Sequence, residues 1–231
     1  VAYEALLPAM VASYMAAFTS HALGLEKFSV PLHETLALST PGQIGQVILL
    51  GAAFGLTGLL FSGLLQKTKA WMAKVLPNPY QRIGLVSVAL AAILFLGLGG
   101  RYCGLGTNLI QAAFAGDKVY SFDWILKLLL TVLTLSIGFQ GGEVTPLFSI
   151  GATLGVLLGN ILGLPVELCA ALGYAAVFGS ATNTLLAPIF IGIEVFGAAN
   201  VVPFTIVCVI AYAINRNRSI YTAQILHRNP S

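Results

Sequence analysis

The chain has 231 residues, of which 58% are hydrophobic and only 8% are charged, and its mean hydropathy is +0.91. A typical soluble domain carries about 25% charged residues, so this chain cannot cover a water-facing surface and most of its exterior must face lipid. The formal net charge is +3, and the basic residues do not cluster with aromatic residues, so nucleic-acid binding has no support.

The apolar segments predict a series of membrane helices, several of them shorter than the roughly 20 residues that cross a bilayer. In chain order, the expected helical segments are 5–25, 43–65, 83–99, 122–137, 146–162, 168–179, the run after Pro188, and 200–214. The segment 104–116, GLGTNLIQAAFAG, is too short and too rich in glycine to span a membrane. No period-two strand pattern is present, so the prediction is an all-α integral membrane protein with several passes.

The flanks of these segments bear on topology. The basic pairs Lys67/Lys69 and Arg216/Arg218 are candidate cytoplasmic flanks by the positive-inside rule. The chain opens on Val1 and runs into an apolar stretch without a basic segment or a cleavage site, so this is not a signal peptide. We expect a chain that begins inside a larger protein.

The cysteines and histidines are scattered and show no metal-ligand spacing. The cysteines lie in or beside apolar stretches and are expected to be buried apolar residues: Cys103, Cys169 and Cys208. The histidines are expected in loops or interfaces: His21, His33 and His227. Neither a metal nor an organic cofactor is predicted.

The segment 138–146, GFQGGEVTP, is the most informative interruption. Gly141 and Gly142 release the backbone from helix, Thr145 can cap a helix, and Pro146 fits a first helical position. The pattern predicts a helix N-terminus at membrane depth, where unpaired N–H groups and the positive end of the dipole can hold an anion. The alternative is a Gly/Pro kink without a ligand.

Two carboxylates stand isolated in apolar sequence. Glu143 has no basic residue within 15 positions on either side. A carboxylate at membrane depth is costly and marks function by default, often proton transfer. It could instead be a water-exposed residue at a helix start, favoured by the dipole. Glu194, in IFIGIEVFG, could lie on a proton path or form a hydrogen bond between helices.

Small hydroxyl residues and one tyrosine are further candidates. The segment 179–184, GSATNT, permits close helix packing and interhelical hydrogen bonds, which we favour over direct ion contact. Tyr221 near the end of the chain could anchor at the membrane interface or donate its hydroxyl group to an anion. Residue type alone favours the anchor.

Four segments together resemble the CLC family of chloride channels and anion–proton antiporters, in family order. They are GLGTNLIQAAFAG (104–116), GGEVTPLFSIGATLG (141–155), GSATNTLLAPIFIGIEVFG (179–197) and SIYTA (219–223). The resemblance implies a subunit of two inverted halves with short, tilted and broken helices, of which this chain is similar to the second only. Motifs like GSGIP and GKEGP of the first half are not present. Residues 1–231 are thus expected to be one membrane domain, the C-terminal half of a longer chain.

The resemblance also implies roles for individual residues. The backbone N–H groups of Glu143 and Val144 would face the anion beside Thr145, and Tyr221 would offer its hydroxyl group. The family usually has Phe at the position of Val144 and an apolar residue at that of Glu143, so GGEVTP looks like the fluoride–proton antiporter branch. A protonated carboxyl group can donate a hydrogen bond to fluoride, a strong acceptor. Glu143 is therefore a proton-coupling candidate. Glu194 stays a candidate on its isolation alone, because it precedes the family's usual glutamate on this helix.

The resulting expectation is a homodimeric multi-pass protein of the cell membrane. It would move a small inorganic anion, with fluoride favoured, coupled to protons, and would need its N-terminal half to do so. One alternative is an ordinary chloride channel or chloride–proton antiporter with a drifted motif. Another is a non-transporting membrane scaffold. An enzyme is not expected, because no HExxH, GxSxG or acid-rich metal motif is present.

Overall fold

The computed structural model describes residues 6–25, 28–32, 34–36, 38–139, 141–215, 218–221 and 224. Val1, His33, Arg216, His227 and the end of SIYTA, 222–223, lie outside the described residues. Within these ranges the chain is helical and contains no strand, as expected for an all-α protein. It divides into two compact units, residues 1–30 and 31–231.

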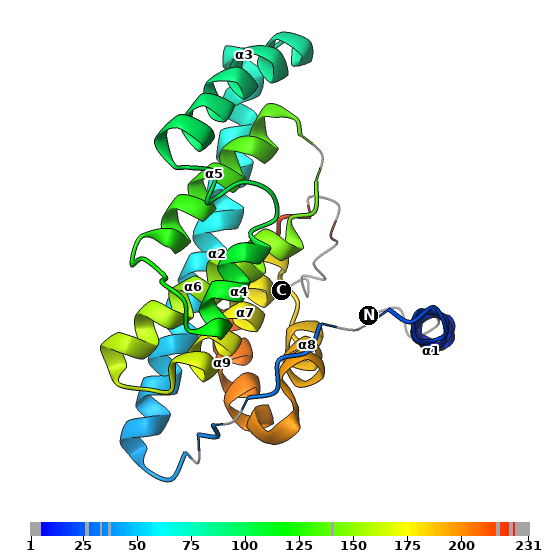
Figure 1. Ribbon diagram of the computed structural model, residues 1–231, viewed down its shortest axis with the longest axis vertical. Coiled ribbons are helices and arrows are strands. Elements are labelled where there is room, and N and C mark those ends of the chain that lie inside the picture. Colours follow the sequence, from blue (N-terminus) through cyan, green and yellow to red (C-terminus); the bar gives the residue numbers. More distant parts are fainter. Residues whose placement is uncertain are drawn as a thin grey trace, which may run out of the picture. The chain divides into compact units, whose positions relative to one another are not determined.

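Among its described residues, the first unit contains one helix, α1 (Leu6–Ala22), close to the expected segment 5–25. The second unit contains the remaining helices (Figure 1). These are α2 (Pro41–Val75), α3 (Pro79–Ala92) with its π-helical extension η2 (Ile93–Gly97), α4 (Thr107–Ala115), α5 (Asp123–Ile137), α6 (Val144–Leu162), α7 (Val166–Thr182), α8 (Leu186–Phe196), the 3-10 turn η3 (Ala198–Asn200) and α9 (Val201–Ile214).

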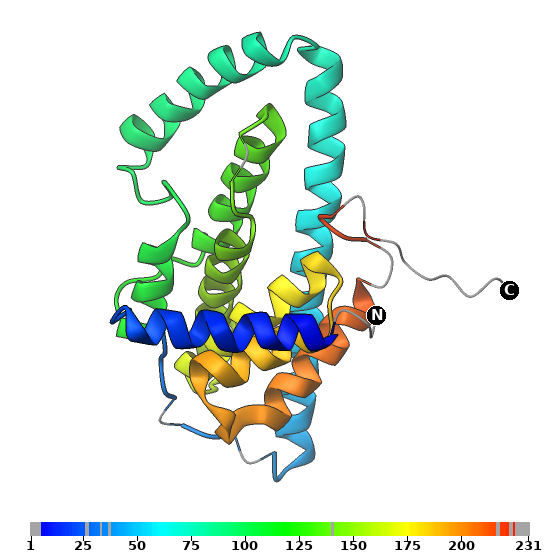
Figure 2. The same ribbon diagram turned by 90° about the vertical axis from the view of Figure 1, so that its right-hand side faces the viewer.

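Helix α2 is the longest element and runs beside α5, α7 and α9 (Figure 2). Its start is fixed by a capping box, in which the Thr40 hydroxyl accepts from the N–H of Gln43 and the Gln43 side chain accepts from the N–H of Thr40. The sequence predicted an end near Lys67. The helix instead continues to Val75, because no glycine or proline interrupts it between Lys67 and Pro77.

Helix α7 is the centre of the second unit and is in contact with α2, α4, α6, α8 and α9. Every residue from Leu168 to Thr182 is buried. Glycines let α6 approach α7 at backbone distance: a Cβ atom at Gly151 would lie 2.0 Å from the carbonyl oxygen of Gly173. A Cβ atom at Gly155 would lie 2.1 Å from the carbonyl oxygen of Cys169. Small residues at this crossing therefore allow the two helices to pack.

The starts of α6 and α8 differ from the expected ones. Helix α6 begins at Val144 after Glu143 as the N-cap residue, and no side chain caps it, so the predicted capping by Thr145 is wrong. Pro146 is the third helical residue, which is allowed because N–H groups of the first turn have no acceptor within the helix. Likewise α8 begins at Leu186, two residues before Pro188.

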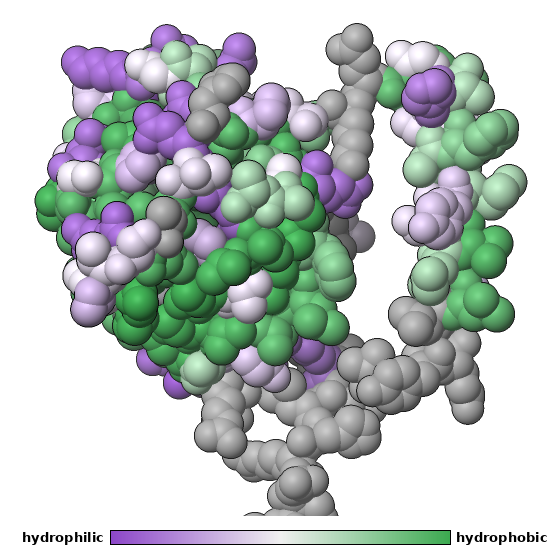
Figure 3. Space-filling model, turned by 90° about the horizontal axis from the view of Figure 1, so that it is seen from below, coloured by the Kyte–Doolittle hydropathy of each residue, from purple (hydrophilic) through white to green (hydrophobic). Residues whose placement is uncertain are grey.

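Among the described residues, three helices are long and apolar enough to cross a membrane: 41–75, 79–96 and 144–162. Helices α5, α7, α8 and α9 have 15, 17, 11 and 14 residues, shorter than the roughly 20 that a straight crossing needs. Broad hydrophobic areas cover the face of the second unit shown in Figure 3. The expected mixture of spanning and short helices is therefore present.

Candidate functional site: the start of helix α6

The loop 138–143 joins the end of α5 to the start of α6 and positions the candidate site. Gly138 ends α5 with a φ of 116°, a left-handed conformation that favours glycine. At the other end of the loop, the N–H groups of Val144 and Thr145 belong to the first turn of a 19-residue helix. They have no acceptor within that helix and carry the positive end of its dipole, so they can bind an anion.

Glu143 lies at this helix start and is not isolated in the fold. Its side chain is 21% exposed, and its Oε1 atom is 4.0 Å from the Nζ atom of Lys69 on α2. The sequence placed no basic residue near Glu143, and the structure supplies one from a distant part of the chain. A cavity of about 310 Å³ lies beside the pair, lined also by Arg82 from α3 and Ser136 from α5.

A second cavity, of about 430 Å³, follows α5 towards the same helix start. It is lined mainly by apolar residues of α3, η2 and α5, and by Gly142 and Pro146 near the start of α6. Its polar lining includes Lys127 and Thr131 of α5. The start of α6 is therefore flanked by two cavities, each lined by a basic side chain.

Lys127 and its neighbours form a polar cluster that sequence reasoning missed. Lys127 is buried, and its Nζ atom donates to the carbonyl oxygens of Tyr102 (3.0 Å) and Gly104 (2.7 Å). One turn earlier, the buried carboxylate of Asp123 accepts from Arg101 at 2.6 and 3.2 Å and from the Tyr102 hydroxyl at 2.6 Å. The signal was two charged residues four positions apart inside the apolar run 122–137.

This cluster fixes the loop 98–106 against α5 and raises the pKa values of two loop residues. Burial and the hydrogen bond to Asp123 raise the pKa of Tyr102 above its ordinary value. The hydrogen bond to Asp123 also raises the pKa of Arg101. Both shifts extend upwards the pH range in which these two loop residues keep their protons.

Tyr221 belongs to a short segment near the end of the chain, and hydrogen bonds hold this segment against the last residues of α7. The N–H group of Ile220 donates to Ala181, and the Ser219 hydroxyl donates to Thr182. Tyr221 is 46% exposed and does not line either cavity beside Glu143. Its hydroxyl contact with an anion stays a prediction.

The remaining candidates are the small-residue segment 179–184, Glu194 and the cysteines. Ser180 is buried and donates to the carbonyl oxygen of Gly55 on α2, as expected for helix packing. Glu194 is an exposed residue of α8, and its proton-coupling role stays a prediction. Cys169 and Cys208 are buried as predicted, and Cys103 is partly buried.

Comparisons with known proteins agree with this architecture. The family described as voltage gated chloride channel matches residues 1–216. A chloride/fluoride channel protein from Pseudomonas syringae pv. tomato is 36% identical over 96% of this chain and 50% of its own length. The crystal structure of a CLC-type fluoride/proton antiporter is 54% identical, with a TM-score of 0.92 over 95% of this chain and 55% of that chain. A eukaryotic CLC transporter is 25% identical, with a TM-score of 0.59 over 80% of this chain and 35% of that chain.

The chain spans about half the length of the first two of these relatives, at 50% and 55%. The resemblance to the CLC family that rests on the four sequence segments is confirmed, as is the similarity to its fluoride branch. The match of the family to residues 1–216, together with the arrangement of short and spanning helices, shows that the chain belongs to the voltage gated chloride channel family, of the CLC type.

Proposed function

We propose that the full-length protein moves a small inorganic anion across the cell membrane in exchange with protons, and that fluoride is the favoured anion. The observation that carries the proposal is Glu143 at the N-cap of α6, beside the free N–H groups of Val144 and Thr145. The similarity to a chloride/fluoride channel protein and to a fluoride/proton antiporter supports it.

The geometry offers a physical reason for proton coupling. An ionised Glu143 repels an anion at the adjacent N–H groups, whereas a protonated Glu143 can donate a hydrogen bond to it. Anion binding at these N–H groups and protonation of Glu143 are therefore linked, so that a change in one alters the other. Fluoride gains most, because it is the smallest halide and the strongest hydrogen-bond acceptor.

We further propose that residues 1–231 form one membrane domain that works with a complementary N-terminal half. In that assembly the hydroxyl group of Tyr221 would complete the anion site, and Glu194 would be a second proton-coupling candidate. Each subunit of a homodimer would hold its own site. The activity is transport rather than enzymatic catalysis, with no cofactor.

The test uses the full-length protein in liposomes, with fluoride efflux and proton movement recorded together. We expect fluoride to leave faster than chloride, with protons moving in exchange. Glu143→Gln should slow fluoride efflux and abolish proton movement, because the amide cannot exchange a proton. Glu167→Gln is the matched control, since Glu167 is an exposed residue at the start of α7 and should behave like the unmodified protein.

Three outcomes would favour the alternatives. Equal fluoride and chloride efflux without proton movement would indicate an ordinary chloride channel. Coupled movement of chloride in preference to fluoride would indicate a chloride–proton antiporter, and absence of any anion flux would indicate a scaffold.

A further inference from the structure

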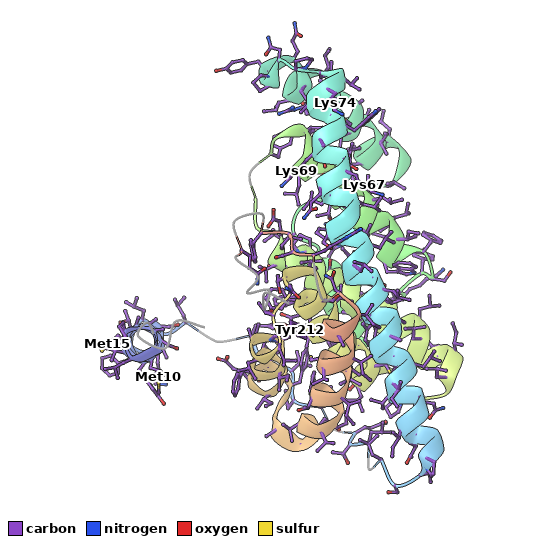
Figure 4. The ribbon with its side chains drawn as sticks, turned by 180° about the vertical axis from the view of Figure 1, so that it is seen from behind. Met10, Met15, Lys67, Lys69, Lys74 and Tyr212 are labelled. Carbon is purple, nitrogen blue, oxygen red and sulfur yellow. The ribbon has the colours of Figure 1, made fainter. Side chains whose placement is uncertain are left out.

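The cavity beside Glu143 is lined by two cationic side chains that come from different helices. Lys69 belongs to α2 and Arg82 to α3, and both line the cavity of about 310 Å³. Figure 4 shows Lys67 and Lys69 on different sides of α2 and Lys74 further along it. Of these three lysines, Lys69 alone lines this cavity.

Arg82 is held in place from the side of α5. Its Nε atom donates to the carbonyl oxygen of Ile137 at 3.1 Å, at the last residue of that helix. A cationic side chain at the C-terminal end of a helix is favoured by the dipole. The guanidinium group is therefore anchored at the same loop that leads to Glu143.

Ser136 gives an independent indication of a ligand. It is 3% exposed, it lines this cavity, and its Oγ atom has no hydrogen-bond partner within the described residues. Buried hydroxyl groups in proteins are almost always hydrogen-bonded, so one without a partner beside a cavity requires an explanation. A bound acceptor in the cavity would satisfy it.

The charge balance of the cavity favours an anion. The charged side chains lining it are Lys69 from α2, Arg82 from α3 and Glu143 at the start of α6, whereas its α5 lining is uncharged. Their sum is one positive charge when Glu143 is ionised and two when it is protonated. Protonation also removes the carboxylate that Lys69 faces at 4.0 Å.

We propose that Lys69, Arg82 and Ser136 form a second binding site for a small inorganic anion, beside the N–H groups at the start of α6. Lys69 pairs with Glu143 when the carboxyl group is ionised and with the anion when it is protonated. The inference rests on the proposed function for the identity of the anion. The second site would hold an anion next to the α6 site, and occupancy of the second site would be linked to the proton on Glu143.

The first experiment measures the initial rate of fluoride efflux from liposomes against fluoride concentration, using the full-length protein. Lys69→Gln should raise the half-saturating concentration by about two- to fivefold, the effect of one partly exposed charge, with a smaller change in the maximal rate. Lys69→Arg should restore it. Lys74→Gln is the matched control, because Lys74 is an exposed lysine of the same helix outside the cavity.

The second experiment measures binding of sodium fluoride to the purified full-length protein by isothermal titration calorimetry. Glu143→Gln, which imitates the protonated state, should bind fluoride more tightly than the unmodified protein. Adding Lys69→Gln or Ser136→Ala to that variant should weaken binding again. Size-exclusion profiles identify any variant that fails to fold.

The outcomes separate this inference from the proposed function. Unchanged half-saturation and unchanged binding in both Lys69→Gln and Ser136→Ala would overturn the second site, even if coupled fluoride transport is intact. Absence of anion transport in the unmodified protein would overturn the proposed function. Calorimetry would still decide whether Lys69 and Ser136 bind fluoride.

Discussion

Replacing Gly151 by alanine should separate α6 from α7. The added Cβ atom would lie 2.0 Å from the carbonyl oxygen of Gly173, whereas heavy atoms in contact lie about 3.5 Å apart. The two backbones must therefore move apart by more than about 1 Å at the centre of the second unit. Overpacking of this kind costs roughly 1–3 kcal/mol, from which the better helix propensity of alanine subtracts about 1 kcal/mol.

The measurement is the thermal unfolding midpoint of the full-length protein in detergent, followed by loss of the size-exclusion peak. The upper end of that range applies here, because the Cβ atom would collide with backbone atoms and not with a flexible side chain. The net cost of about 2 kcal/mol corresponds to a decrease of roughly 4–8 °C for a domain of this size. Gly45→Ala is the control, because Gly45 lies in α2 with no atom within 4 Å of the position that a Cβ atom would take. This control should unfold at the same temperature as the unmodified protein or higher. Equal midpoints for Gly151→Ala and the unmodified protein would refute the close-packing argument.

Two further predictions concern the polar cluster at the start of α5. Asp123→Asn should destabilise the protein by roughly 1.5–3 kcal/mol, because the hydrogen bonds of Arg101 and Tyr102 to the buried carboxylate are weakened while Arg101 itself stays partly exposed. The double variant with Arg101→Gln should lose less than the two single changes added together, and the same thermal assay checks both. The raised pKa of Tyr102 predicts that its hydrogen bond to Asp123 stabilises the fold fully below the ordinary tyrosine pKa of about 10 and is lost only as the pH rises through the higher folded value. Tyr102→Phe should remove that alkaline decrease in the unfolding midpoint, and an unchanged decrease would assign it to another group.

The sequence predicted the helices well and their ends poorly. Apolar runs separated by glycine and proline located the helices of the second unit other than α4, because such runs have no other stable form in lipid. Lys67 and Lys69 misled the prediction for α2, since a lysine is a good helix former and its charge does not end a helix. Pro146 misled the prediction for α6, because proline fits several positions of a first turn.

Only part of the candidate site could be predicted from the sequence. The glycines, Glu143 and Val144 are consecutive residues, so the helix start could be derived from local rules. The pairing of Lys69 with Glu143 depends on how α2 passes the loop between α5 and α6, which no local pattern specifies. The cluster of Arg101, Asp123 and Lys127 carried a weak signal in the two charges at the start of an apolar helix.

The glycine crossing of α6 and α7 has a consequence for how the protein can move. Two backbones in direct contact cannot slide or rotate past each other without a collision, so these helices should act as one rigid body during any working cycle. Gly141 and Gly142, in contrast, have no atom within 4 Å of a Cβ position. Movement near the proposed anion site is thus expected in the loop that precedes α6, while α6 itself stays fixed relative to α7.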